Sequence, residues 1–543
     1  MEFDAVLIEP RLKEMTEKGF WHDRTPNDFF DQCLARTPDK LAVASIKVET
    51  GARTNLTYRE LDRLARRAAV GLTRLGVVSG DVVTCQLPNG WEFVVTYLAC
   101  TRVGAVFNPV MHIFRERELG FILAHGESKV FVVPARFRGF DHAAMAGELQ
   151  AKMPNLEHTV VVDGEGENSF DALLLDPGFD DVEFTETRRG PNEVCELIYT
   201  SGTTGEPKGV MHTANTIHAN LIPFAERLRL GESDVFLMAS PMGHQTGFAY
   251  GLVLSIQTNA STILMDNWDK NIAARLIASD GVTFTMASTP FLMDLTAAVE
   301  ETGADTSSLR VFLCSGTTIP GPVVDRAQKS LGASVISAWG MSENGAVTMI
   351  FPDDPPDRAV TTDGCPLPGV EIEIRDETGN PVGPDTEGDL FLRSCSNFGG
   401  YLKRPHLNDV DENGWFNTGD RAMLNAEGYI RVCGRSKDII IRGAENIPVV
   451  EVEAILIKHP AIATVAVVGY PDERLGERAC AFVTLTPGKA FSFEEMKTYL
   501  AEQKLAKQYW PERLEIREAL PSTASGKIQK FVLRKMLTEE AGQ

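Results

Sequence analysis

Residues 199–210 read Tyr-Thr-Ser-Gly-Thr-Thr-Gly-Glu-Pro-Lys-Gly-Val, a run of mostly small and hydroxylated side chains around one lysine. The apolar pair Leu197 and Ile198 precedes it and predicts a strand that ends in a loop. Glycines let backbone N–H groups come close to a phosphate, and the hydroxyls add further donors. Lys208 supplies a positive charge for a phosphate oxygen. The run therefore predicts a loop that wraps a polyphosphate.

This loop differs from the nucleotide loop of P-loop proteins. Counted from Gly202, Pro207 stands where the second glycine belongs, and Gly209 stands where the Ser or Thr belongs. A surface linker is the alternative interpretation of a run rich in Gly and Thr. We favour the phosphate loop, because a linker has no need of a lysine among uncharged or weakly acidic neighbours.

The run resembles the phosphate loop of the adenylate-forming superfamily, which comprises acyl-CoA synthetases, luciferases and the adenylation domains of peptide synthetases. Further motifs follow in the order that this family has, so the resemblance covers nearly the whole chain. They are Trp339-Gly340-Met341-Ser342-Glu343, Gly-Trp-Phe-Asn-Thr-Gly-Asp at 414–420, Gly-Arg-Ser-Lys-Asp-Ile-Ile at 434–440, and Pro-Ser-Thr-Ala-Ser-Gly-Lys at 521–527.

The composition excludes several classes of function. With 53 basic and 75 acidic residues the net charge is −22, which argues against nucleic acid or an anionic membrane as a partner. Nine scattered cysteines without a Cys-x-x-Cys pair favour reduced thiols in a cytoplasmic protein. We expect no membrane span, because no uncharged apolar run approaches the required length. The first residues lack the charged and apolar regions of a signal peptide. The oligomeric state stays open.

The length of the chain and the change in its helix and strand pattern predict more than one domain. The 543 residues exceed one ordinary domain. Strand-like runs alternate with helical patterns in the first two-thirds, which predicts an α/β fold of packed, mostly parallel sheets with helices. The sequence then becomes rich in hairpins, and it ends in an α+β pattern. We expect a large domain over 1–434 with a β-rich subdomain at about 350–434, a hinge at 435–437, and a small mobile domain over 438–543.

Local signals place individual elements within these domains. The residues from Thr57 to Glu60 have the form of a capping box, and apolar residues at helical spacing follow as far as Gly76. The strand-like runs are 82–87, 130–133, 160–162, 261–264, 311–313, 370–374, 390–392, 464–468 and 480–485.

The resemblance implies an ATP site. Trp339 would pack on the adenine, the Asp420 carboxylate would accept hydrogen bonds from both ribose hydroxyls, and Arg435 would reach the ribose or the α-phosphate. Residues 315–318 resemble the loop beside the adenine, with a plain turn as the alternative. The set implied for ATP is Thr200, Ser201, Gly202, Thr203, Thr204, Gly205, Lys208, Gly316, Trp339, Gly340, Asp420, Arg435 and Lys527.

The chemistry of carboxylic acid activation accounts for these residue types. A carboxylate repels nucleophiles and oxide is a poor leaving group, but a mixed anhydride with AMP removes both obstacles. Bringing two anions together requires Mg²⁺ and preorganised donors around the developing charge. The resemblance assigns Glu343 to Mg²⁺, a hard cation that prefers carboxylate oxygen. It assigns catalytic roles also to Thr200, Lys208 and Lys527, the last as a bridge between carboxylate and α-phosphate.

The acyl pocket is expected to form from residues 244–251 and 337–346. His244 lies where acyl-CoA synthetases have an aromatic residue that gates the thiol tunnel, although a packing histidine is an equal alternative. Gly247 and Gly345 are small, so we expect a cavity that admits a ring or a medium chain rather than only acetate.

Two further assignments concern CoA and the domain boundary. Gly443 and Glu445 resemble the loop beside the pantetheine channel, and Lys437 falls at the hinge of the family. The Pro448-Val449 pair replaces the commoner Tyr-Pro. With this departure the chain resembles bacterial cyclohexanecarboxylate–CoA ligases and medium-chain relatives.

The motifs together predict an ATP-dependent carboxylic acid–CoA ligase. It would form acyl-AMP and pyrophosphate, and then acyl-CoA and AMP, so its partners are a small acid, ATP and CoA. A stand-alone adenylation enzyme that loads a carrier protein is the main alternative. A luciferase-like oxygenase and a nucleotide-binding regulator without catalysis are the others, and four retained functional residues argue against the regulator: Glu343, Asp420, Arg435 and Lys527.

Overall fold

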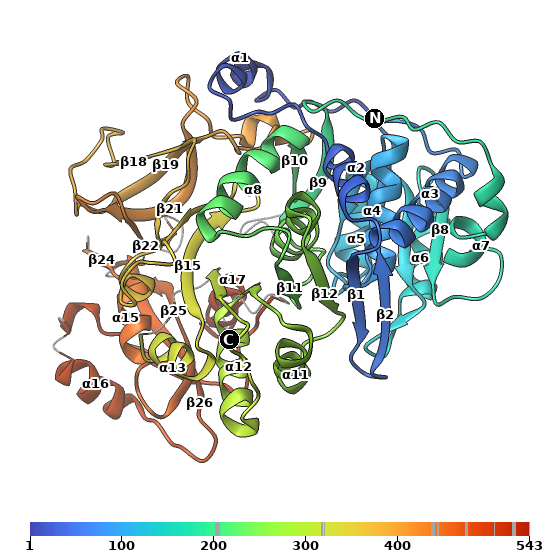
Figure 1. Cartoon of the computed structure of the whole chain (residues 1–543). Helices are drawn as coiled ribbons and strands as arrows, with labels where there is room; N and C mark the ends of the chain where they lie inside the picture. The colour runs from blue at the N-terminus through green and yellow to red at the C-terminus, as the bar shows by residue number, and fades with distance from the viewer. Residues whose placement is uncertain are drawn as a thin grey trace.

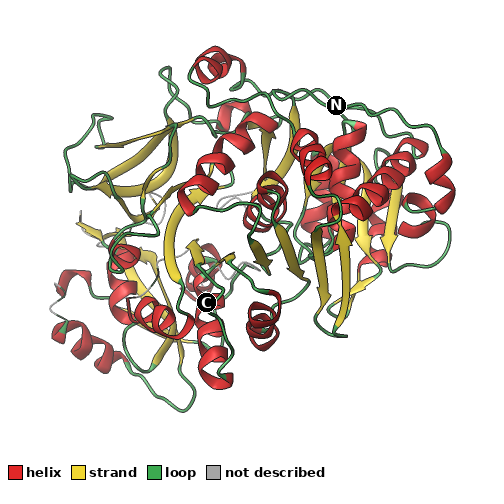
Figure 2. Ribbon diagram, in the orientation of Figure 1, coloured by secondary structure: helices red, strands yellow, loops and turns green. Residues whose placement is uncertain are grey.

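The computed structural model describes residues 1–200, 207–315, 319, 321–435, 440–442, 445–472, 476–503, 505, 507–523 and 528–541. It confirms the predicted α/β class, with a large N-terminal domain and a smaller C-terminal domain (Figure 1). Helices lie beside the sheets throughout the large domain (Figure 2). Every strand-like run predicted from the sequence lies in or overlaps a strand.

One sheet of the large domain has a parallel centre and antiparallel edges. Its central strands are apolar and buried, as parallel strands covered on both faces must be. The predicted parallel pairing is confirmed there, whereas the antiparallel edges were not predicted. The order is β17 (Cys365–Pro366), β16 (Gly345–Met349), β15 (Ser334–Met341), β14 (Val311–Ser315), β13 (Phe284–Ala287), β11 (Val235–Met238), β12 (Ser261–Met265), β1 (Leu41–Lys47) and β2 (Ala52–Thr57).

A second sheet carries the phosphate-loop sequence. Its order is β20 (Gly400–Tyr401), β10 (Lys208–Thr213), β9 (Val194–Thr200), β4 (Val106–Pro109), β3 (Val82–Cys85), β5 (Ser128–Pro134) and β8 (His158–Val162). β9 and β10 are antiparallel, with Thr200 opposite Lys208. The predicted loop therefore connects two strands of a hairpin, unlike a P-loop, which connects a strand to a helix.

Long helices pack between and around these sheets. The predicted capping box is confirmed at Thr57, where α3 (Tyr58–Arg74) begins, and Gly76 follows its end with a positive φ. Burial along most of α4 (Trp91–Val103) explains its nearly continuous apolar sequence. The other main helices of this domain are α1 (Glu9–Glu17), α2 (Pro26–Arg36), α5 (Glu116–His125), α6 (His142–Lys152), α8 (Ala214–Leu228), α11 (Lys270–Asp280), α12 (Thr289–Thr302) and α13 (Gly321–Leu331).

Two smaller sheets follow along the chain. The predicted hairpin section forms an antiparallel sheet in the order β18 (Val370–Arg375), β19 (Gly388–Ser394), β21 (Phe416–Leu424) and β22 (Ile430–Arg435). The small domain has the order β24 (Glu445–Ile447), β23 (Ile440–Arg442), β26 (Gly476–Leu485) and β25 (Ile462–Asp472), with β27 (Arg513–Ile516) on β26. Its helices are α15 (Val449–Leu456), α16 (Phe493–Glu502) and α17 (Lys530–Ala541). In the described part of the chain, no helix is long and apolar enough to cross a membrane.

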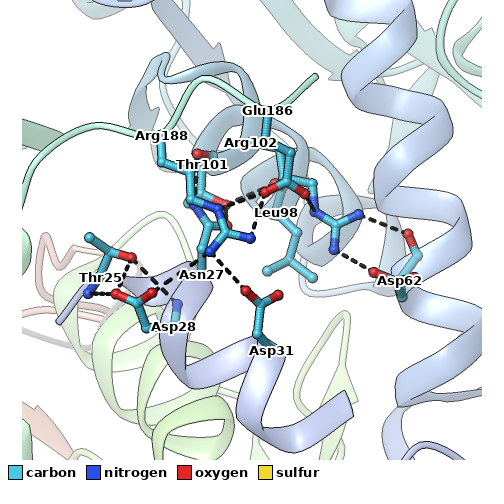
Figure 3. A network of polar contacts seen from close by, with 10 residues as sticks. All are labelled: Thr25, Asn27, Asp28, Asp31, Asp62, Leu98, Thr101, Arg102, Glu186 and Arg188. Atoms are coloured by element: carbon cyan, nitrogen blue, oxygen red, sulfur yellow. Dashed lines mark hydrogen bonds and ion pairs between the residues drawn. The ribbon is translucent and has the colours of Figure 1, made fainter. Parts of the chain in front are cut away.

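A network of hydrogen bonds and ion pairs joins residues 186–188, which precede β9, to helices α2, α3 and α4 (Figure 3). The Arg102 guanidinium on α4 donates to the Asp62 carbonyl and carboxylate at 3.0 and 2.6 Å, and lies 3.5 Å from the Glu186 carboxylate. The Thr187 N–H donates to the Arg102 carbonyl. Arg188 pairs with Asp31 of α2 at 2.7 Å. The network thus fixes the segment through which the chain approaches β9.

Alanine in place of Arg102 is expected to lower the free energy of unfolding by about 2–3 kcal/mol. The Arg102 side chain is 4% exposed, so its removal leaves the carboxylates of Asp62 and Glu186 without this charged partner, although both keep some contact with water. Urea unfolding measures the effect. Arg63→Ala on the exposed face of α3 is the matched control and should change little. Equal stability of both variants would contradict a structural role for the network.

Candidate active site

The turn between β15 and β16 lies at the centre of the candidate site. A side chain at Gly340 would collide with the Gly345 carbonyl oxygen, and one at Gly345 would collide with Asn220 and Tyr250. Gly345 also has a φ of +73°. Both glycines are therefore required where two strands cross closely. The same turn places Trp339 and Glu343 within five residues of each other in the chain.

Glu343 and Lys208 meet around the ring of Tyr401. The Tyr401 hydroxyl donates to Glu343 Oε1 at 2.7 Å, and Lys208 Nζ lies 4.1 Å from the centre of the same ring. Glu343 is only 4% exposed. A cation over a tyrosine ring is stabilised by the ring quadrupole, and the buried carboxylate gains a donor. The structure thus brings two predicted catalytic residues together through a third residue that sequence analysis did not identify.

His212 ties this turn to β10. Its Nε2 donates to the Ser342 carbonyl at 2.7 Å, and its Nδ1 lies 3.0 Å from the Thr216 hydroxyl. Burial lowers the pKa of His212 to about 4, so the ring stays neutral and holds one tautomer. The Phe398 N–H donates to the Glu343 carbonyl at 2.7 Å. Hydrogen bonds to the carbonyls of Ser342 and Glu343 therefore fix the backbone before and after the Glu343 side chain.

Predicted nucleotide residues gather on the other side of the turn. The indole N–H of Trp339 donates to Asp420 Oδ2 at 3.0 Å, and both residues are at least partly buried. Arg435 stands opposite Asp420 in the β21–β22 ladder. The indole of Trp339, the carboxylate of Asp420 and the backbone position of Arg435 thus come together from three strands of two sheets. Their role in binding the base and the ribose stays a prediction.

The two segments predicted to form the acyl pocket are joined by Tyr250. Its hydroxyl accepts from the Ala346 N–H at 2.5 Å and donates to Asn220 Oδ1 at 2.7 Å, while Asn220 Nδ2 donates to the Ala346 carbonyl at 2.9 Å. His244 caps the short helix α9 (Gln245–Gly247) by accepting from the Thr246 N–H.

The glycines of these segments have packing explanations. A side chain at Gly247 would collide with the carbonyls of Ser240 and Pro241, as one at Gly345 would collide with Asn220 and Tyr250. Close approach of the chain therefore accounts for both small residues. Their size is not by itself an indication of a roomy cavity, and their place in the pocket stays a prediction.

For the remaining predicted site residues, the structure gives a backbone position, or they lie outside the described range. Thr200 ends β9, and Glu445 begins β24 opposite Arg442. Outside the described residues lie Ser201, Gly202, Thr203, Thr204, Gly205, Gly316, Lys437, Gly443 and Lys527.

The described residues fit one magnesium ion held partly by substrate. Nowhere in the described part of the chain do three or more His, Cys, Asp or Glu side chains form a metal cage. Mg²⁺ keeps several waters and binds through one or two carboxylates plus substrate phosphates, so a single buried carboxylate beside a phosphate loop suits it. Glu343 meets that requirement, with Tyr401 as its orienting donor.

Known proteins match the chain over nearly its whole length. The profile of the AMP-binding enzyme family matches residues 29–402, and that of the AMP-binding enzyme C-terminal domain matches residues 451–527. A medium-chain fatty-acid–CoA ligase of Escherichia coli is 38% identical over 540 residues, which are 98% of this chain and 94% of the relative. A salicyl-AMP ligase / salicyl-S-ArCP synthetase of Mycobacterium tuberculosis is 34% identical over 528 residues, 96% and 92% of the two chains. ATP-bound MatB from Rhodopseudomonas palustris has a TM-score of 0.83 and 26% identity, covering 95% of this chain and 100% of that one.

Proposed function

We propose that this chain, which belongs to the AMP-binding enzyme family, is an ATP-dependent carboxylic acid–CoA ligase for a medium-chain or alicyclic acid. The arrangement of Lys208, Tyr401 and Glu343 carries the proposal, because it sets a cation and a carboxylate around one phenol beside the phosphate-loop strands. ATP and CoA are the co-substrates that the family implies.

The first half-reaction uses the two sides of the β15–β16 turn. A carboxylate oxygen of the acid attacks the α-phosphorus of ATP, the bond to pyrophosphate breaks, and acyl-AMP forms. Trp339 and Asp420 hold the nucleoside, and Lys208 stabilises the phosphate charge. Glu343 would hold Mg²⁺, which would supply positive charge to screen the phosphates and polarise the phosphorus. Lys527 bridges the incoming carboxylate and the α-phosphate.

The second half-reaction needs no nucleophile from the protein. The CoA sulfur attacks the acyl carbon, the bond to the AMP oxygen breaks, and the thiol proton leaves to solvent. Gly443 and Glu445 flank the pantetheine arm in this proposal, and His244 lies at the acyl end of the tunnel. The chain alternates between the two half-reactions about a hinge at Lys437.

Pyrophosphate release across aliphatic, alicyclic and aromatic acids is expected to give the highest kcat/KM with a medium-chain or alicyclic acid. Cyclohexanecarboxylate is the best single candidate, from the resemblance of residues 339–345 and 443–449 to such ligases. A relative named for medium-chain fatty acids, 38% identical, supports the same size class. The highest kcat/KM with acetate would contradict this expectation.

Loading of a carrier protein is the second candidate function. The relative named salicyl-S-ArCP synthetase, at 34% identity, favours it. Transfer from acyl-AMP to CoA and to a phosphopantetheinylated carrier domain, measured side by side, separates the two. We expect CoA to be the acceptor, and exclusive transfer to the carrier would select the alternative.

A further inference from the structure

The N-terminal segment of the chain packs against the segment that leads to Tyr401. Residues 394–401 run from the end of β19 to β20, and all of them are buried. Residues 395–399 form no strand or helix, so their carbonyls depend on donors from elsewhere in the chain. The profile of the AMP-binding family begins only at residue 29, so the N-terminal donors described next lie outside it.

Arg11 on α1 supplies donors to three of these carbonyls. Its guanidinium donates from Nη1 to the Ser394 carbonyl at 3.1 Å, and from Nη2 to the carbonyls of Asn397 and Phe398 at 2.8 Å each. Its Nε donates to the Leu7 carbonyl at 2.8 Å, which holds the planar group in one orientation. Burial lowers the pKa of Arg11 to about 10, so the group stays charged at neutral pH and makes charge-assisted bonds.

Two further donors come from the same N-terminal segment. The indole N–H of Trp21, a residue that is 2% exposed, donates to the Cys395 carbonyl at 2.9 Å. The Leu7 N–H donates to the Gly399 carbonyl at 3.1 Å. Donors from residues 7–21 thus reach the carbonyls at positions 394, 395, 397, 398 and 399.

The same buried segment holds Glu343. The Phe398 N–H donates to the Glu343 carbonyl at 2.7 Å, and the Ser396 hydroxyl donates to the Asn344 carbonyl at 2.8 Å. Phe398 therefore accepts from Arg11 through its carbonyl and donates to Glu343 through its N–H. Hydrogen bonds in series thus connect a guanidinium on α1 to the backbone of the glutamate assigned to Mg²⁺.

We propose that Arg11 is a positioning residue for acyl-AMP formation, which acts by fixing segment 394–401 against Glu343. This inference rests on the proposed function. Mg²⁺ demands near-ideal geometry from its ligands, so a carboxylate that holds it must be placed accurately. Without Arg11, the carbonyls of Ser394, Asn397 and Phe398 lose a charged donor, and the segment shifts to satisfy them. Glu343 then shifts with the segment that holds it.

The test measures ATP–pyrophosphate exchange against Mg²⁺ concentration in the full-length Arg11→Ala variant, with the fastest acid of the pyrophosphate-release panel. The Mg²⁺ concentration for half the maximal rate should rise at least about 10-fold, the scale of losing a group that orients a metal ligand. Thioester formation from supplied acyl-AMP and CoA, in which no phosphate is attacked, should keep its rate. Added guanidinium ion at a concentration below that which unfolds the protein should restore part of the exchange.

Arg11→Lys is the conservative variant. Lysine keeps the charge but lacks the planar fork that serves several carbonyls at once, so the Mg²⁺ requirement should rise less than in Arg11→Ala. This variant decides the matter if Arg11→Ala does not fold.

Two control variants separate positioning from stability. Lys13→Ala removes a charge from the same helix, where the Lys13 side chain is 85% exposed, and should change neither half-reaction. Arg102→Ala should lower stability, as argued above, without changing the Mg²⁺ requirement, because its network joins other segments.

An unchanged Mg²⁺ requirement in the Arg11 variants, or an equal loss of both half-reactions, would overturn this inference alone. Absence of exchange with every acid in the unmodified protein would overturn the proposed function and this inference with it.

Discussion

Glutamine in place of Glu343 is expected to lower the rate of acyl-AMP formation at least about 100-fold and to raise the Mg²⁺ concentration needed for half the maximal rate. Glutamine keeps the shape of the side chain and an oxygen for the Tyr401 hydroxyl 2.7 Å away. It replaces a charged carboxylate by a neutral amide oxygen, which is a weaker ligand for a hard cation. Because Glu343 is buried, solvent screens that charge only weakly, so the loss is felt in full. ATP–pyrophosphate exchange against Mg²⁺ concentration measures both effects.

Tyr401→Phe is the control for this prediction. It keeps the ring beneath Lys208 and removes only the hydroxyl that orients Glu343. We expect a loss of about 10-fold or less, the scale of one hydrogen bond that supports a ligand. Thermal unfolding of both variants should match that of the unmodified protein. A Glu343→Gln variant with normal exchange and normal Mg²⁺ dependence would show that this carboxylate is structural.

Sequence motifs predicted those parts of the candidate site that depend on local chemistry. The motifs around Lys208, Trp339 and Asp420 can each be recognised from a few consecutive residues. The structure places all three residues beside the turn between β15 and β16. The capping box at Thr57 and the hairpin of β18 and β19 were predictable for the same reason. Each signal is contained in one short stretch, where side-chain chemistry and backbone conformation are coupled directly.

The residues that connect these parts were not predictable from one sequence. Tyr401 reaches Glu343 across 58 residues, and Tyr250 reaches Ala346 across 96. These pairs exist because strand order places β20 beside β10, and the turn between β15 and β16 beside α8 and the π-helix η2 (Phe248–Val253). No spacing rule encodes such neighbours. Arg11 gave no signal either, since an arginine on a helix is most often a solvated side chain, and only its partners show otherwise.

The two half-reactions are expected to separate when Lys527 and Lys437 are changed one at a time. Lys527→Ala should slow acyl-AMP formation at least about 100-fold, the scale of one lost charge stabiliser in the transition state. It should leave thioester formation from supplied acyl-AMP nearly intact. Lys530→Ala is the matched control, because Lys530 is paired with Glu453 at 2.8 Å within the small domain and should affect neither step.

Lys437→Pro should do the reverse. Lys437 lies between β22, which belongs to a sheet of the large domain, and β23, which belongs to the sheet of the small domain. Proline fixes φ near −65°, so the backbone at this position could not rotate as domain alternation demands. Acyl-AMP formation should survive if the adenylating orientation tolerates that angle, and transfer to CoA should collapse.

Lys437→Ala, which leaves φ free, is the control and should retain both steps. Equal loss of both steps in the Lys527→Ala and Lys437→Pro variants would mean that the two lysines act through stability or a shared site, and alternation between two orientations would lose its support.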